Sequence, residues 1–151
     1  MNETWMVAHD FSPESDLAVE EAARVVARLG GRMVLLHVHP TLQAALGEET
    51  FHLEDALRDR LTEMVAALRE RHPLLMDVAI DVVPASDAAR GILDEAARLD
   101  VDHIVVGTHD RRGFEHLILG SVAERVAKRA DVPVTIVRQH AAHKSENTTA
   151  E

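Results

Sequence analysis

The sequence predicts an α/β fold: a five-stranded, doubly wound parallel sheet in the strand order 3-2-1-4-5, with four helices. Short apolar runs alternate with longer stretches of helical periodicity along the chain, which is the pattern of successive β-α-β units. Some of these runs are unbroken, as is typical of strands that are covered on both faces. Right-handed crossovers between parallel strands then restrict the order in which the strands can lie.

The first two strands and the helix between them are predicted from clear local signals. Trp5–His9 is a short apolar run, and the segment Arg32–His39 contains a solid apolar core. Ser12 suits the N-cap of the intervening helix, because Pro13 is favoured at the first helical position and acidic residues fill the first turn. Gly30 and the glycine after it are expected to end that helix.

The remaining elements continue the alternation after a polar loop expected over Pro40–Glu49. The further strands are expected over Asp77–Pro84, Asp102–Gly107 and Val132–Val137. The further helices are expected over Leu53–Arg71, from Ser86 or Asp87 to Leu99, and over Ser121–Ala130. The apolar residues expected to bury one face of the second helix are Leu53, Leu57, Leu61, Met64, Val65 and Leu68. On its exposed side, Glu54 and Arg58 are spaced for an ion pair.

Composition restricts the class of protein. The chain has 151 residues, enough for one domain with a sizeable core, and it has no cysteine for disulfides, zinc or thiol catalysis. Its formal net charge of −10 argues against nucleic acid and anionic membranes as partners. No apolar run reaches the length of a membrane helix, and the first residues lack the basic region of a signal peptide, so we expect a cytoplasmic protein.

One domain is expected over residues 1–138, followed by a disordered polar tail over residues 139–151. In the predicted strand order the winding reverses between strands 1 and 4, and ligands of such folds bind at that point, beyond the carboxyl ends of the strands. Two loops are expected to meet there, residues 9–12 and the segment that starts at Gly107.

The segment Gly107–Val122 resembles the nucleotide-binding loop of universal stress proteins. That loop has the pattern Gly, two residues, Gly, nine residues, Gly and then Ser or Thr, and this chain matches it at Gly107, Gly120 and Ser121. The resemblance extends from strand 1 to strand 5, and it implies the adenine-nucleotide alpha-hydrolase-like fold. Further matching runs are Val34–Val38, Ile104–Val106, Val122–Val126 and Val132–Val134.

The resemblance also implies a binding site for an adenine nucleotide such as ATP or AMP. The positions that match the family's site are Asp10, Val38, Gly107, Gly120, Ser121 and Val122. In such a site the amides at the start of the last helix can donate to phosphate. Asp10 can accept hydrogen bonds from ribose or adenine groups, and Val38 can contact the base.

One position departs from the pattern, because Asp110 replaces its second glycine. A carboxylate next to a triphosphate is repulsive by about 1–4 kcal/mol. A bridging Mg²⁺ or Mn²⁺, or Arg111 and Arg112, can offset that repulsion. Two hypotheses therefore stay open: a small regulatory module that binds an adenine nucleotide weakly or metal-dependently, or a stress protein of the same fold that does not bind nucleotide and acts as a dimeric interaction module. No catalytic residue is identified, so we expect at most slow ATP hydrolysis.

Several of these residues also have structural interpretations. Ser121 and Glu124 form a capping-box pattern, Gly107 and Gly120 can serve tight packing, and Asp10 can bond neighbouring loop amides.

Four histidines are candidate ligands. His37 and His39 share one face of a strand and could bind a metal ion, although no third ligand is evident; His109 and His116, which flank the loop, could touch phosphate.

The predicted edge strand Val132–Val137 is apolar and nearly uncharged, and bare edges tend to be paired. The resemblance implies dimers through this strand, so we expect a homodimer. We also expect a protein partner, whose identity the sequence does not give.

Overall fold

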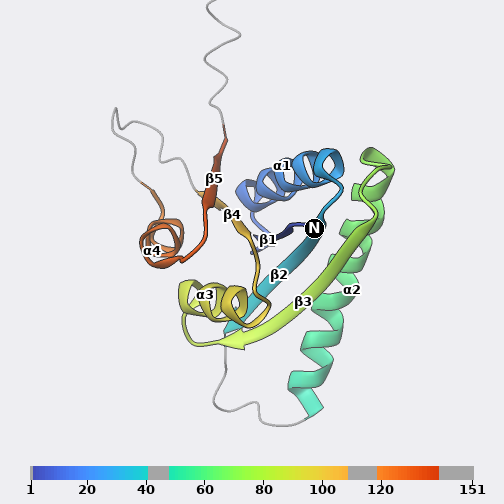
Figure 1. Ribbon diagram of the computed structural model, residues 1–151. Helices are drawn as coiled ribbons and strands as arrows, with labels where there is room; N and C mark the ends of the chain where they lie inside the picture. Colours follow the sequence, from blue (N-terminus) through green and yellow to red (C-terminus); the bar gives the residue numbers. More distant parts are fainter. Residues whose placement is uncertain (1, 41–47, 109–118, 140–151) are drawn as a thin grey trace, which may run out of the picture.

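The computed structural model describes residues 2–40, 48–108 and 119–139. Its elements in chain order are β1 (Thr4–Ala8), α1 (Pro13–Leu29), β2 (Arg32–Pro40), α2 (Glu48–Arg71), β3 (Asp77–Ala85), α3 (Ala88–Arg98), β4 (His103–Thr108), α4 (Ser121–Arg129) and β5 (Val134–Arg138). The strands form one parallel sheet in the order β3-β2-β1-β4-β5 (Figure 1), which confirms the predicted fold class and strand order.

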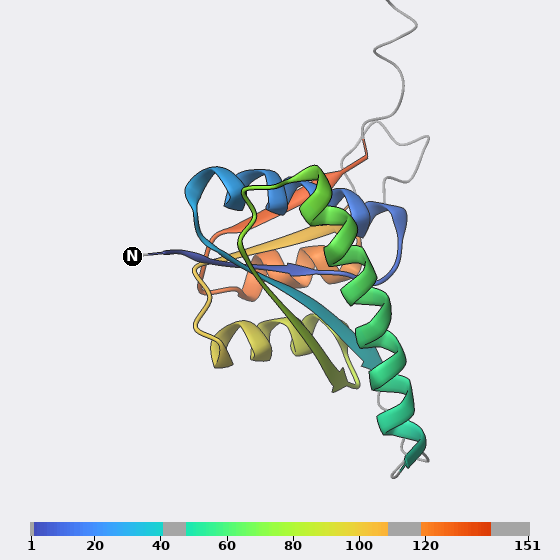
Figure 2. The ribbon, with the colours of Figure 1, turned by 90° about the vertical axis from the view of Figure 1, so that its right-hand side faces the viewer.

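Different helix pairs cover the two faces of the sheet. α1 and α2 lie on one face, and α3 and α4 lie on the other (Figure 1, Figure 2). Alternate residues of β2 supply both cores, because Met33 and Leu35 pack with α1 and α2, whereas Val34 and Leu36 pack with α3 and α4. Each of the four is at most 3% exposed. The unbroken apolar run is therefore explained by a strand that is buried on both sides.

The ends of α1 form as the sequence predicts. The Ser12 hydroxyl caps the helix by accepting a hydrogen bond from the Ser15 N–H at 3.2 Å. At the other end Gly30 adopts the left-handed conformation with a φ of 71°, and its N–H donates to the Val26 carbonyl. The Ser12 cap positions the start of α1 directly after β1, at the carboxyl edge of the sheet.

The structure corrects the start and the buried face of α2. The helix begins at Glu48 rather than Leu53, and Leu53 itself is 43% exposed. The first turns of α2 extend past the ends of the strands (Figure 2), so no sheet lies beneath them. Leu61 and Leu68, further along, are fully buried as expected. Glu54 was predicted to pair with Arg58, but its Oε1 lies 2.9 Å from the Nε2 of His39.

The last strand is an edge strand, as predicted, with shifted bounds. It spans Val134–Arg138 rather than Val132–Val137, and within the described residues it pairs with β4 alone. Pro133 has no N–H to donate, so the regular hydrogen bonding between β4 and β5 begins after it. The Pro133 carbonyl still accepts a hydrogen bond from the Ile104 N–H at 3.0 Å. Residues 140–151 lie outside the described part of the chain, so the predicted tail stays a prediction.

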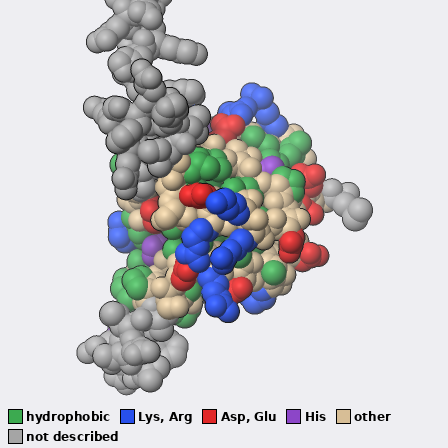
Figure 3. Space-filling view, turned by 90° about the vertical axis from the view of Figure 1, so that its left-hand side faces the viewer, with side chains coloured by type: hydrophobic (Ala, Val, Ile, Leu, Met, Phe, Trp, Pro, Cys, Tyr) green, Lys and Arg blue, Asp and Glu red, His purple; other side chains and the backbone are tan. Residues whose placement is uncertain are grey.

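The face formed by α3 and α4 is held together by a cross-helix ion pair. Asp87 caps α3 by accepting from the Ala89 N–H at 3.0 Å, and its other oxygen lies 2.5 Å from an Arg125 nitrogen on α4. Figure 3 shows this face, where lysine and arginine side chains gather among acidic ones. None of the described helices is long and apolar enough to cross a membrane.

Candidate functional site

A pocket of about 290 Å³ opens at the carboxyl ends of β1, β2 and β4. This volume is near the lower end of the range of small-molecule sites, roughly 300–1,000 Å³. The pocket lies where the winding of the sheet reverses, between β1 and β4. All of the predicted site residues that match the family's motif line it: Asp10, Val38, Gly107, Gly120, Ser121 and Val122. Their role in binding stays a prediction.

The start of α4 forms one wall of the pocket. Gly120 is the N-cap residue and Ser121 is the first helical residue, so the capping-box prediction, which made Ser121 the cap, is wrong. Among the described residues, no side chain caps this helix end by a hydrogen bond. Ser121 and Val122, in the first turn, line the pocket. An N-terminal turn without a side-chain cap offers backbone donors and the positive end of the helix dipole to an anion.

Thr108 fixes the position of that turn. Its side chain is 2% exposed, and its Oγ1 accepts a hydrogen bond from the Gly120 N–H at 2.8 Å. The end of β4 is thereby joined to the start of α4 across the segment that the structure does not describe. Sequence reasoning missed Thr108; the available signal was a hydroxyl at the buried end of a strand, which needs a partner.

Gly107 is required by close packing. A Cβ at this position would lie 2.5 Å from the Glu14 carbonyl oxygen and 3.0 Å from the Ser15 nitrogen, so only glycine lets β4 approach the first turn of α1. Gly120 is less constrained, because its Cβ would lie 3.3 Å from the Thr108 Oγ1. The packing interpretation of Gly107 is therefore correct, and the same residue also lines the pocket.

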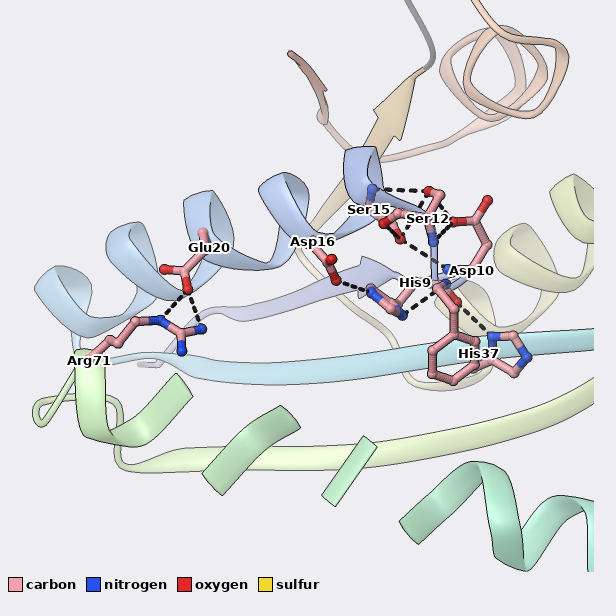
Figure 4. Close-up of polar contacts among 9 residues, drawn as sticks. His9, Asp10, Ser12, Ser15, Asp16, Glu20, His37 and Arg71 are labelled. Atoms are coloured by element: carbon pink, nitrogen blue, oxygen red, sulfur yellow. Dashed lines mark hydrogen bonds and ion pairs between the residues drawn. The ribbon is translucent and has the colours of Figure 1, made fainter. Parts of the chain in front are cut away.

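Asp10 stands at the exposed rim of the pocket, in the β1–α1 loop (Figure 4). Its Oδ1 accepts from the Ser12 N–H at 3.0 Å and also from the Ser12 hydroxyl. Its own N–H donates to the Ser15 hydroxyl at 3.3 Å. The predicted bonding of Asp10 to its own loop is thus present, and it holds the carboxylate in one place beside the pocket.

Two histidines that sequence reasoning did not connect to the site lie behind this loop. His9 is 3% exposed, and its Nε2 lies 2.7 Å from an Asp16 oxygen. The Nδ1–H of His37 donates to the His9 carbonyl at 2.7 Å. Burial lowers the pKa of His37, although the hydrogen bond to that carbonyl acts in the opposite direction. The signal that could have pointed to His9 is a histidine at the buried end of a strand, next to Asp10.

His37 and His39 were also considered as metal ligands. His37 is engaged with the β1–α1 loop, and His39 with Glu54 of α2. Among the residues that the structure describes, no three His, Asp or Glu side chains are grouped to hold a metal ion. The loop residues between Thr108 and Leu119 that the sequence analysis places near phosphate lie outside the described residues; they are His109, Asp110, Arg111, Arg112 and His116.

Comparison with known proteins supports the same assignment for most of the chain. A sequence model described as the Universal stress protein family matches residues 1–138. A curated universal stress protein of Mycolicibacterium smegmatis is 36% identical over 132 residues, which are 85% of this chain and 43% of that protein. A relative from Mycobacterium tuberculosis is 31% identical over 137 residues, 89% of this chain and 45% of its own length. The chain therefore spans less than half the length of these curated relatives.

Solved structures share the fold. The universal stress protein of Archaeoglobus fulgidus in complex with dAMP has a TM-score of 0.65 at 21% identity, covering 89% of this chain and 97% of that one. A universal stress protein in complex with cAMP has a TM-score of 0.63 at 22% identity, covering 92% and 98%. At these identities the likeness shows the arrangement of helices and strands.

Proposed function

The chain belongs to the universal stress protein family, and from this membership we propose that it is a small regulatory module whose pocket binds an adenine nucleotide. The observation that carries the proposal is the convergence of Asp10, Val38 and the start of α4 on one pocket. These residues come from three separate parts of the chain and offer different chemistry to one ligand.

The two ends of the pocket suit the two ends of a nucleotide. Gly120, the N-cap residue of α4, has no side chain, so the amides of the first turn can donate hydrogen bonds to a phosphate. Val38, Ile92 and Val106 provide an apolar wall from β2, α3 and β4, which suits an adenine ring. Asp10, at the rim, is positioned to accept hydrogen bonds from ribose hydroxyls. Two structural neighbours were crystallised with cAMP and dAMP, which supports an adenine nucleotide as the ligand class.

The charge of the site favours few phosphates unless a cation is present. Asp10 and Glu14 both line the pocket, and the whole chain carries a formal net charge of −10. Each further phosphate adds repulsion from these carboxylates. We therefore propose that AMP-like ligands bind without metal, and that ATP binds only with Mg²⁺ or Mn²⁺.

A thermal-shift titration tests the proposal. A ligand that binds only the native state raises the free energy of unfolding by RT ln(1 + [L]/Kd). We expect AMP, cAMP and Mg-ATP to raise the melting temperature, and ATP with a chelator to leave it unchanged. Absence of a shift for every nucleotide at millimolar concentration would contradict the proposal and favour the alternative, an interaction module that binds no nucleotide.

A charge variant locates the site. Ser121→Glu places a carboxylate in the first turn of α4, where it interacts favourably with the helix dipole but occupies the phosphate position. We expect unchanged or slightly higher stability without ligand, together with loss of the nucleotide shift. Ala127→Glu adds the same charge at an exposed position of α4 that does not line the pocket, and it should bind as the wild type does. Equal binding by both variants would place the ligand elsewhere.

A further inference from the structure

The β1–α1 loop contains a bulky residue in an unfavourable conformation. Phe11 has a φ of 64°, in the left-handed region that residues with a large side chain rarely adopt. Such a conformation persists only where the surroundings hold it, and it occurs often next to ligand sites. Phe11 lies between Asp10 and Ser12, the two residues whose hydrogen bonds fix the rim of the pocket.

Three aromatic and cationic contacts hold the Phe11 ring on the α1/α2 side of the sheet. Its centroid lies 5.0 Å from that of His9, edge to face, and 4.8 Å from that of His37. The guanidinium of Arg60, from α2, lies 3.9 Å from the ring centroid. The ring therefore ties the loop to β2 and α2, and packs against the first residue after β1.

A side chain also holds the backbone of Phe11. The Phe11 N–H donates to the Nδ1 of His9 at 3.1 Å, and the Nε2 of His9 lies 2.7 Å from the Asp16 carboxylate. A backbone N–H can only donate and a carboxylate can only accept, so Nδ1 is the acceptor and Nε2 carries the hydrogen. Both ring nitrogens of this buried histidine are thus used in its neutral form.

Protonation of His9 is incompatible with this arrangement. A second hydrogen, on Nδ1, would point at the Phe11 N–H and leave two donors facing each other in a buried place. The charged and titratable groups near the ring come from four elements. Asp16 of α1 contacts Nε2, and Asp10 follows His9 in the loop. His37 of β2 donates to the His9 carbonyl, and Arg60 of α2 lies over the Phe11 ring. His39 is engaged with Glu54.

We propose that His9 is the positioning residue of the pocket: its neutral ring holds Phe11 in the left-handed conformation, which places Asp10 for the ligand, so that acidification weakens binding. The proposal rests on the proposed nucleotide site and adds a means of regulating it. Figure 4 shows His9 directed away from Asp10, toward Asp16 on α1. His9 also lines the pocket, but both of its ring nitrogens are engaged within the protein, so its effect on the ligand passes through the loop and Asp10.

Two substitutions of His9 test the roles of its two ring nitrogens separately. In His9→Asn the side-chain oxygen takes the place of Nδ1, keeps the acceptor for the Phe11 N–H and cannot titrate. In His9→Gln the amide nitrogen takes the place of Nε2, keeps the donor to Asp16 and removes the acceptor. His72→Asn is the matched control, because His72 makes the same 2.7 Å contact with a carboxylate, that of Glu20, and does not line the pocket.

Binding is measured by calorimetry with cAMP, whose phosphodiester keeps a single charge while histidines change theirs between about pH 8 and about pH 5. We expect wild type and His72→Asn to lose affinity about tenfold across this range, since a buried donor loses its acceptor. His9→Asn should bind as wild type does at high pH and show no such loss. His9→Gln should bind about tenfold more weakly at every pH. Tight binding by His9→Gln, or unchanged pH dependence in His9→Asn, would overturn the proposal.

Nitrogen NMR of the ligand-free protein separates this proposal from the proposed function. The ring nitrogens of His9 should report hydrogen on Nε2 at neutral pH, and the Phe11 amide resonance should move as His9 titrates. If cAMP fails to bind but these shifts appear, the nucleotide site is wrong and the positioning role of His9 stands. If the Phe11 amide resonance does not move as His9 titrates, the positioning role is wrong whether or not nucleotide binds.

Discussion

At the scale of single residues, Gly107 and Gly120 belong to one motif but have different reasons to be glycine. A methyl group at Gly107 would meet the backbone of α1 at 2.5 Å, whereas at Gly120 it would meet a side-chain oxygen at 3.3 Å. Backbone cannot move aside as a side chain can. We expect Gly107→Ala to lower the free energy of unfolding by about 2 kcal/mol and Gly120→Ala by less than about 1 kcal/mol. Urea unfolding followed by Trp5 fluorescence measures both; equal losses would contradict this account.

Asp81 on β3 is a residue whose ionisation opposes folding. Burial and the neighbouring Glu95 carboxylate raise the pKa of Asp81 from 3.8 to about 6. Because the pKa of Asp81 is raised in the folded state, the contribution of its protonated side chain to folding stability is complete below about pH 4. That contribution is lost as the pH rises through about 6. Asp81→Asn mimics the protonated form. We expect it to match the wild type near pH 4 and to exceed it by about 1–2 kcal/mol near pH 8.

Thermal or urea unfolding across this pH range measures the effect of Asp81→Asn. Asp77→Asn is a suitable control, because Asp77 lies on the same strand and is exposed. It should show little change at either pH. If the stability of the wild type rose between about pH 5 and about pH 7 and that of Asp81→Asn did not, ionised Asp81 would stabilise the fold, which would contradict this prediction.

At the scale of elements, Asp87 performs two separable tasks for α3. Its Oδ1 caps the helix, and its Oδ2 pairs with Arg125 of α4. Asp87→Ser keeps a cap and loses the ion pair, whereas Asp87→Ala loses both. We expect Asp87→Ala to lower the free energy of unfolding clearly more than Asp87→Ser does, because serine retains a cap and the ion pair is partly exposed. Similar losses in the two variants would assign the effect to the ion pair.

The elements that could be predicted are those whose signals are local. Apolar runs and the helix ends at Ser12 and Gly30 depend on neighbours in sequence, and the structure places them as expected. The early turns of α2 could not be recognised, because a helix that extends beyond the sheet has no buried face to leave an apolar pattern. Ser121 matched a capping box, yet the cap position belongs to Gly120.

The candidate site could be predicted only where it follows the family's motif. The partners of Thr108 and His9 lie 12 and 7 residues away and are brought together by the folded chain. No spacing rule in the sequence pairs a strand-end threonine with a helix-start amide. The tautomer of His9 likewise follows from two contacts that exist only after β1, α1 and the loop have assembled.

At the scale of the whole molecule, the strand order leaves β5 as an edge, and this edge leads to a prediction about association. The residues of β5 before Arg138 are half-buried and uncharged, and among the described strands only β4 pairs with it. Unpaired N–H and C=O groups along such an edge favour pairing with a second chain. We therefore expect a homodimer in which the β5 strands of two copies meet.

A charged side chain on this edge tests the association. Thr135→Lys introduces a positive charge into β5 of both copies, so that each dimer would bring two of these charges together. We expect the wild type to sediment as a dimer at micromolar concentration and Thr135→Lys as a monomer with unchanged circular dichroism. Ala127→Lys adds the same charge on α4 and should remain dimeric. Because Thr135 also bonds His103 at 2.7 Å, Thr135→Ser retains that hydroxyl and should dimerise as the wild type does. A monomeric wild type would contradict the predicted dimer. A dimer that persists in Thr135→Lys would place the interface elsewhere.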